Sequence, residues 1–438
     1  MFTKTTNLKG TLPLIATLTY FGYFLLDKIH HTTYDNAFRM EVPLDFSIYL
    51  LGGQRVTNHE NLYDGTIIDP WPFTYPPFAG WLFSLWNGAS FESATVIWHA
   101  ISFAALTTVI LMVIRSLKIK ITPWTTLAAI GTAFALLALD PIQGTFFFGQ
   151  INIVLMLLVA ADFLPGKHRL PGIGTGLAAG IKLTPALFGV LFLLQKRWWA
   201  AAGCFATFLA TVGIGYLTVE DAHVYWTEKI ADSTRIGDHD HPAAQSIKSV
   251  MIREFGTDST TTWVLLVAVV CAVVFTGAWF LLRAQQEALA VGTVGLAACL
   301  ISPFSWFHHW VWFAMIFAVI LFGGMRALQS GVGSLFSGPW AHSVIRVLSQ
   351  FAFIVPVLVC MWLGHWIVTA PVHGGETPTY SVFFPSMQEQ HGWLFTVFGA
   401  SVMVAVCVWG VVSWLWCRSS RREVVVCELG DGEEIVFG

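Results

Sequence analysis

The sequence has few charged residues. Only 11% of its 438 residues are Asp, Glu, Lys or Arg, whereas 55% are hydrophobic and the mean hydropathy is +0.66. A soluble globular protein carries about 25% charged residues, so this chain has too few to cover a surface that faces water. The composition therefore excludes a soluble enzyme and a disordered chain. The net charge of −3 indicates no polyanionic partner, and we expect no nucleic-acid binding.

Cysteine is also scarce. The chain has seven cysteines, with no CxxC pair and no spacing typical of a metal site. This excludes a cysteine-ligated metal and predicts small residues packed in a core. We expect no cofactor and no divalent metal.

Long apolar runs make up most of the chain. Several reach the roughly 18–20 residues that cross a bilayer. We therefore predict an all-α polytopic membrane protein with about 10–12 transmembrane helices, in one domain over residues 1–416, followed by a cytoplasmic tail over 417–438. Ten spans are assigned, to residues 11–26, 91–114, 120–139, 146–163, 198–218, 259–282, 287–302, 308–323, 344–366 and 392–416.

Two further apolar segments are ambiguous. Residues 73–86 are too short to span comfortably, and Pro76-Pro77 disfavour a helix start there. Residues 170–194 contain Gly, Lys182 and Pro185 and could form a hairpin of two short helices. Within this segment three glycines at intervals of four residues would permit close helix packing; they are Gly172, Gly176 and Gly180.

The distribution of charges orients the predicted spans in the membrane. Most Lys and Arg residues fall in the short loops on one side, and most Asp and Glu residues fall on the other. Positive loops stay in the cytoplasm, so both termini should be cytoplasmic in a plasma-membrane protein. The long loops over about 30–72, 219–258 and 367–391 then lie outside. Long loops in compact proteins are usually functional or disordered. These loops are rich in Trp, Tyr and Phe, which argues against disorder, so we expect the active site to face outward.

The first outer loop holds the most informative carboxylate. Pro43 can open a helix, which places Asp45 in the first turn and Tyr49 on the same face, one turn later. Gly52-Gly53 would end the helix or let the backbone approach a ligand. Asp45 is either a carboxylate favoured by the helix dipole or a general base at the outer membrane surface.

Other polar residues stand where hydrocarbon should begin. Gln150 and Asn152 must face the bundle or a cavity. A charge at the bilayer centre costs about 2.5–3.5 kcal/mol, so Lys182 either extends to a nearby aqueous face or binds an anion. His308-His309 lie among tryptophans and form either a polar site or an interfacial packing unit.

The second outer loop contains a polar run and two basic residues. Asp238-His239-Asp240-His241 could bind a metal, but a solvated loop is the simpler interpretation. Farther along, Lys248 and Arg253 could pair with a lipid phosphate.

Seven short blocks occur in an order that resembles a bacterial family, the polyprenyl-phosphate-mannose-dependent α-1,2-mannosyltransferases of mycobacteria and corynebacteria. The resemblance covers roughly residues 10–325. The blocks are Asp45-Phe46-x-x-Tyr49-x-x-Gly52-Gly53, Leu62-Tyr63, Phe73-Thr74-Tyr75-Pro76-Pro77-Phe78, Gly149-Gln150-Ile151-Asn152, Ile181-Lys182-Leu183-Thr184-Pro185, Gln245-Ser246, and Ser302-Pro303-x-Ser305-Trp306-x-His308-His309.

The resemblance implies a GT-C-type membrane glycosyltransferase. The donor would be a polyprenyl-phosphate sugar, the acceptor a mannolipid or lipoglycan, and the reaction an inversion that forms an α-1,2 linkage. Asp45 would be the general base. The substrate-binding residues would be Tyr49, Tyr75, Gln150, Asn152, Gln245, His308 and His309, and the candidates for holding phosphate are Lys182, Lys248, Arg253 and Arg55.

Three alternatives stay open. The same fold could use polyprenyl-phosphate arabinofuranose, and the residues do not separate the two sugars. A transporter would usually show inverted repeats and matching broken helices, and the sequence has no such internal symmetry. A non-catalytic scaffold would give no reason for Asp45 and the ordered blocks.

Overall fold

A computed structural model describes residues 19, 43–137, 139–164, 172–326 and 393–430. The spans predicted over 11–26 and 344–366 and the third outer loop lie outside these residues, apart from residue 19, and so do residues 431–438 of the C-terminal tail.

The described part of the chain is helical, and its only β-type pairings are two isolated bridges. This confirms the all-α prediction. The α-helices are α3 (Leu44–Thr57), α4 (Pro77–Ser84), α5 (Phe91–Ser116), α6 (Pro123–Leu136), α7 (Asp140–Phe148), α8 (Asn152–Phe163), α9 (Ile173–Ile181), α10 (Gly189–Leu194), α11 (Trp198–Thr218), α12 (Ala222–Val224), α13 (Ile247–Phe255), α14 (Thr260–Arg283), α15 (Glu287–Ile301), α16 (Phe313–Ala318) and α19 (Trp393–Gly430). Short 3-10 or π-helical turns are η1 (Thr184–Phe188), η2 (Tyr225–Lys229), η3 (Thr234–Ile236), η4 (Phe307–His309) and η5 (Val319–Gly323).

Four described helices are long and apolar enough to cross a membrane: α5, α11, α14 and α19. They coincide with four predicted spans, and α6 with α7 forms a pair bent by 82° that would add a fifth crossing. The spans predicted over 287–302 and 308–323 contain shorter apolar helices. A polytopic membrane protein is therefore confirmed.

The span predicted over 146–163 is interrupted. Residues up to Phe148 complete α7, Gly149 adopts a left-handed conformation with φ 65°, and α8 begins only at Asn152. A Cβ on Gly149 would lie 2.6 Å from the Cβ of Phe46, so glycine both makes the turn and lets α3 approach. The break brings Gln150 beside α3 instead of leaving it within a continuous helix.

The segment 170–194 is a succession of short helices, α9, η1 and α10, as its Gly and Pro content indicated. Its three spaced glycines face α11. Added Cβ atoms at Gly172, Gly176 and Gly180 would lie 2.0 Å from Ala200 O, 2.5 Å from Cys204 O and 2.1 Å from Thr211 Oγ1. The glycine stripe therefore sets how closely α9 packs on α11.

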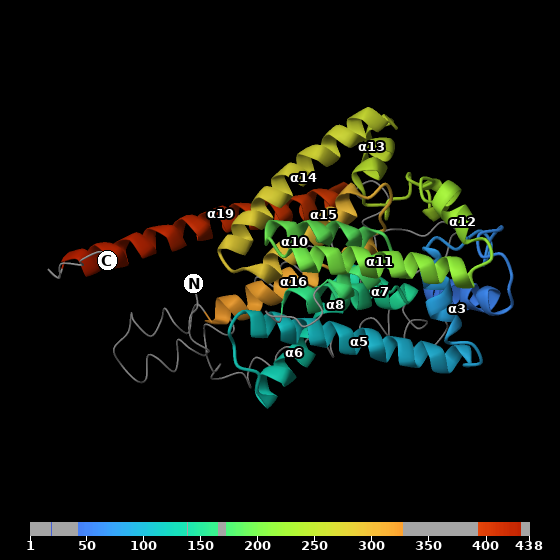
Figure 1. The fold of residues 1–438 in the computed structure, drawn as a ribbon, viewed down its shortest axis with the longest axis horizontal. Coiled ribbons are helices and arrows are strands. Elements are labelled where there is room, and N and C mark those ends of the chain that lie inside the picture. The colour runs from blue at the N-terminus through green and yellow to red at the C-terminus, as the bar shows by residue number, and fades with distance from the viewer. Residues whose placement is uncertain (1–18, 20–42, 138, 165–171, 327–392, 431–438) are drawn as a thin grey trace.

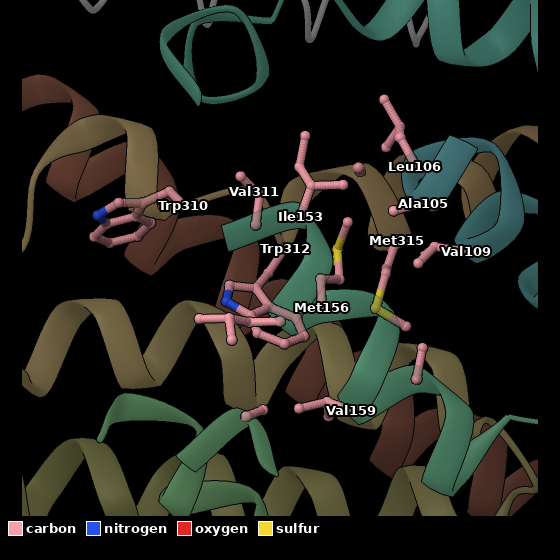
Figure 2. Close-up of a cluster of buried hydrophobic side chains, with 14 of the residues drawn as sticks. Ala105, Leu106, Val109, Ile153, Met156, Val159, Trp310, Val311, Trp312 and Met315 are labelled. Atoms are coloured by element: carbon pink, nitrogen blue, oxygen red, sulfur yellow. The ribbon is translucent and has the colours of Figure 1, made fainter. Parts of the chain in front are cut away.

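The core lies where α5, α8 and the chain around α16 meet. Figure 2 shows Leu106 and Val109 of α5, Met156 of α8, and Trp312 and Met315 in one buried cluster. These side chains are almost fully buried, although they belong to segments distant in sequence. In Figure 1, α5 and α11 run along the length of the molecule, with α3 and α12 together at one end.

Candidate functional site

Helix α3 carries Asp45 as the sequence predicted. Its N-cap is Pro43, and Asp45 is the acidic residue of the first turn. The helix does not end at Gly52-Gly53 but continues to Thr57. The glycines admit neighbouring protein rather than a ligand, because added Cβ atoms would lie 2.6 Å from the Phe73 ring and 2.5 Å from the Phe83 backbone. Close contact with α4 and the preceding segment thus fixes α3.

Asp45 opens on a cavity of about 600 Å³, within the range of about 300–1,000 Å³ that is usual for small-molecule sites. The cavity is formed by α3, the residues before α4, the α7–α8 turn, η1, the second outer loop, and the ends of α14 and α15. The polar residues that line it are Asp45, Thr74, Tyr75, Gln150, Lys182, Thr184, Asp232, Ser233, Arg235, His241, Ser302, His308 and His309.

The cavity lies at one end of the bundle. Trp263, in the first turn of α14, lines it, and Arg283 ends the same helix. With a rise of 1.5 Å per residue, the two residues are about 30 Å apart, close to the thickness of the hydrocarbon core. Helix α5 runs the same way, from the end of the bundle that holds Asp45 toward the opposite end. Trp98 in its first half stacks on Phe46, the neighbour of Asp45, and Arg115 occupies its last turn. Basic helix ends therefore lie at the end remote from Asp45.

A hydrogen-bond network supports Asp45 from within the protein. The Gln150 Nε2 atom donates to the Tyr75 hydroxyl at 2.7 Å, and the Tyr49 hydroxyl lies 2.9 Å from Gln150 Oε1 and 3.0 Å from the Tyr75 hydroxyl. Gln150 also hydrogen-bonds to Asp45. The structure thus brings together four residues predicted from the sequence. Tyr49 stands behind the others and does not line the cavity.

The environment of Asp45 changes its acidity. Burial raises its pKa from 3.8 to about 7, and the Gln150 hydrogen bond and the positive charge of Lys182 limit this rise. The side chain is 21% exposed, and it faces the cavity. The low pKa that a helix N-terminus would favour is outweighed by desolvation, which yields a carboxylate suited to accept a proton near neutral pH.

His308 is the second polar side chain beside this carboxylate. Its Nε2 atom lies 3.8 Å from Asp45 Oδ2, and the side chain is 4% exposed. Neither ring nitrogen has a hydrogen-bond partner among the described residues, and buried polar atoms rarely remain unpaired. His309 differs, because its Nδ1 accepts from Trp306 N at 3.3 Å while its Nε2 is unpaired. Both imidazoles line the cavity.

Lys182 extends into the cavity rather than away from the bundle. Its Nζ donates to Asn152 Oδ1 at 3.0 Å and lies 5.6 Å from the centre of the Tyr75 ring. Asn152 also donates to the backbone carbonyl of His308 at 3.1 Å. Asn152 therefore positions both Lys182 and His308, and it does not itself line the main cavity.

Four sequence candidates lie elsewhere. Gln245 is buried. Its Oε1 atom accepts from Thr396 Oγ1 and its Nε2 atom donates to Pro242 O, each at 2.5 Å. None of the three basic candidates lines the cavity. Arg55 donates to the carbonyls of Asp64 and Thr66, and Lys248 pairs with Asp258 at 3.1 Å. Arg253 pairs with Glu254 and donates to the carbonyls of His241 and Ala244.

Sequence reasoning missed Arg235, which lines the cavity. Its Nε donates to Lys229 O at 2.8 Å and its Nη1 to Phe73 O at 3.3 Å, and the guanidinium lies over the Tyr225 ring. Along with Lys182, it supplies positive charge to the site. The signal in the sequence was its position, because a basic residue in an outer loop runs against the general charge distribution.

The polar run in the second outer loop is partly buried. His239 Nδ1 forms a hydrogen bond with Ser249 Oγ at 3.0 Å, and the imidazole ring packs on Phe304. Asp238 is exposed. The prediction of a wholly solvated loop was therefore wrong for His239. Among the described residues, no group of three or more His, Cys, Asp or Glu side chains is arranged to hold a metal.

Comparisons with known proteins place the chain in a family of glycosyltransferases. The model of glycosyltransferase family 87 matches residues 73–303. The chain is 34% identical, over 72% of its length and 78% of the relative, to a polyprenol-phosphate-mannose-dependent α-(1-2)-phosphatidylinositol pentamannoside mannosyltransferase of Mycolicibacterium smegmatis. It is 32% identical, over 69% of its length and 73% of the relative, to the phosphatidylinositol mannoside mannosyltransferase of that type from Mycobacterium tuberculosis. No solved structure matches significantly.

Proposed function

Since the chain belongs to glycosyltransferase family 87 and is a membrane glycosyltransferase, we propose that it transfers mannose from polyprenol-phosphate mannose to a phosphatidylinositol mannoside. The product would carry a new α-1,2 linkage, as the names of its relatives state for theirs. A larger mannolipid or a lipoglycan would also serve as acceptor if it ended in the same terminal mannose.

One observation carries this proposal. Asp45, a carboxylate with a pKa of about 7, faces a cavity that also contains Lys182 and Arg235. A carboxylate near neutrality can take a proton, and cations stabilise a departing phosphate. The transfer of a sugar from a sugar phosphate needs a base for the acceptor hydroxyl and cations for the departing phosphate. It needs no acid to protonate the leaving group.

The reaction follows from these roles. The acceptor hydroxyl attacks C1 of mannose while Asp45 takes its proton, and the bond from C1 to the phosphate oxygen breaks. The electron pair of that bond leaves with the polyprenyl phosphate, whose negative charge Lys182 and Arg235 stabilise. Attack on the face opposite the phosphate converts a β-linked donor into an α-linked product. A base of this kind contributes about 10²–10⁴-fold to the rate.

The wall of the cavity suits a lipid-linked donor. Trp263 and Val267 of α14 line it, and neighbouring residues of that helix, Leu265 and Val269, are 63% and 59% exposed. A helix that is apolar on its exposed face is suited to lie against lipid. A prenyl chain could thus leave the cavity along α14 while its phosphate remains near Lys182.

The direction of the site follows from the basic helix ends. Arg115, Arg197 and Arg283 mark helix ends remote from Asp45, and the positive-inside rule assigns that end to the cytoplasm. The proposed site therefore faces outward from the plasma membrane. Modifying a cysteine introduced at exposed Thr66 with a reagent that does not cross the membrane would test this orientation.

A transfer assay tests the function. Purified protein in lipid vesicles would be given polyprenyl-phosphate mannose and phosphatidylinositol mannoside, with linkage analysis of the product and Asp45→Asn as the matched control. We expect α-1,2-mannosylation by the wild type alone. Transfer from polyprenyl-phosphate arabinofuranose but not mannose would assign the other sugar, and uptake without transfer would favour a transporter.

A further inference from the structure

A second hollow adjoins the catalytic cavity on the surface of the outer loops. It has a volume of about 570 Å³ and lies between the loop before α4, η3 and α13. Trp71, Pro72 and Arg235 line both hollows, so the two meet across these residues. We call the second hollow the loop groove. The residues that line it include Thr66, Trp71, Thr234, Arg235 and Asp238.

We propose that the loop groove binds the mannose units of the acceptor that lie behind the one receiving the new sugar. This inference rests on the proposed function. It would make the groove the part of the protein that measures the length of the acceptor's glycan.

The chemistry of the groove fits an oligosaccharide. Trp71 is half-buried and offers an indole ring, a large rigid surface with a polar edge. Asp238 is exposed and uses Oδ1 to accept from Asp240 N at 2.9 Å, while its Oδ2 makes no hydrogen bond with the described residues. Thr66 and Thr234 also line the groove and carry hydroxyl groups. Sugars combine apolar ring faces with hydroxyl edges, so a groove of this kind matches both.

The position of the groove also fits. An acceptor hydroxyl at Asp45 leaves the rest of its glycan to pass out of the cavity, and Arg235 and Trp71 stand where the two hollows join. A single-mannose acceptor would reach Asp45 without filling the groove, whereas a five-mannose acceptor would extend into it. The name of one relative specifies a pentamannoside acceptor, which is long enough to reach beyond the catalytic cavity.

The test blocks the groove without touching the catalytic cavity. Thr66 is exposed, lines only the groove, and contributes its backbone carbonyl, not its hydroxyl, to Arg55. Thr66→Trp should fill the space and leave the fold intact. Asn61→Trp is the matched control, because Asn61 is exposed in the same loop, also gives its backbone carbonyl to Arg55, and does not line the groove.

The measurement is kcat and KM with phosphatidylinositol monomannoside and with phosphatidylinositol pentamannoside. We expect the wild type to prefer the longer acceptor, and Thr66→Trp to remove that preference by raising KM for the pentamannoside about tenfold. The monomannoside KM, and both KM values of Asn61→Trp, should be unchanged. An unaltered length preference in Thr66→Trp would overturn the inference. Failure of the wild type to transfer mannose to either acceptor would instead reject the proposed function.

Discussion

His308 Nε2 lies 3.8 Å from Asp45 Oδ2, and neither nitrogen of this buried imidazole has a hydrogen-bond partner among the described residues. The two side chains come from segments more than 260 positions apart, and both line the same cavity. The gap between them is slightly longer than a hydrogen bond, and it leaves the imidazole free to bind a hydroxyl of the substrate.

Asp45→Asn should abolish transfer while the protein remains folded and inserted. The amide keeps the shape and the hydrogen-bonding capacity of the carboxylate but cannot act as a base, so kcat should fall about 10²–10⁴-fold. Steady-state transfer with polyprenyl-phosphate mannose measures this, with size-exclusion behaviour in detergent as the check on folding. Full activity of the variant would remove Asp45 from the base role.

The pH dependence of transfer should report the acidity of Asp45. Its pKa is raised to about 7 and only the ionised form accepts a proton, so kcat/KM should fall about tenfold per pH unit below pH 7 and level off above it. The Gln150 hydrogen bond lowers this pKa. Gln150→Leu should therefore move the acid limb to higher pH, and a limb that stays in place would contradict the assignment.

His308→Ala should reduce activity less than Asp45→Asn. If the imidazole binds and orients the substrate, as we propose, and Asp45 takes the proton, the loss should be about 10–100-fold, close to the value of one or two hydrogen bonds to substrate. His308→Gln, which can still donate and accept, should recover part of the loss. A rate equal to that of the wild type in the alanine variant would exclude His308 from the site.

The cations of the cavity should affect use of the donor. Lys182→Gln and Arg235→Gln remove positive charge next to the departing phosphate, and each should lower kcat/KM for the donor by about 10-fold or more. Lys248→Gln is the comparison, because Lys248 pairs with Asp258 outside the cavity. Equal losses in all three variants would show that net charge, rather than position, governs donor use.

The glycine stripe of α9 should control stability. In Gly176→Ala the new methyl group would lie 2.5 Å from Cys204 O and 2.7 Å from Thr207 Cβ, and such overpacking destabilises by about 1–3 kcal/mol. Gly189→Ala in α10 is the control, since nothing lies within 4 Å of its Cβ position. Thermal unfolding in detergent should show a lower midpoint for the first variant only.

The sequence by itself determined the class of the protein and its principal carboxylate. Apolar runs long enough to span a bilayer specify helices whatever they pack against, because backbone groups in lipid must pair within their own segment. Asp45 could be placed in a first turn because Pro43 and the helix period are local features. The glycine stripe was readable for the same reason.

Only the tertiary structure decided which distant residues share the cavity. Arg235 and Lys182 reach the site of Asp45, whereas Arg55 and Arg253 bind backbone carbonyls of nearby loops. Arg55, Arg235 and Arg253 looked alike in the sequence as cations of the outer loops, because charge carries no information about which loop folds over which helix end. The pKa of Asp45 was equally hidden: it depends on burial by segments far away in the chain, and this desolvation outweighs the local influence of the helix start.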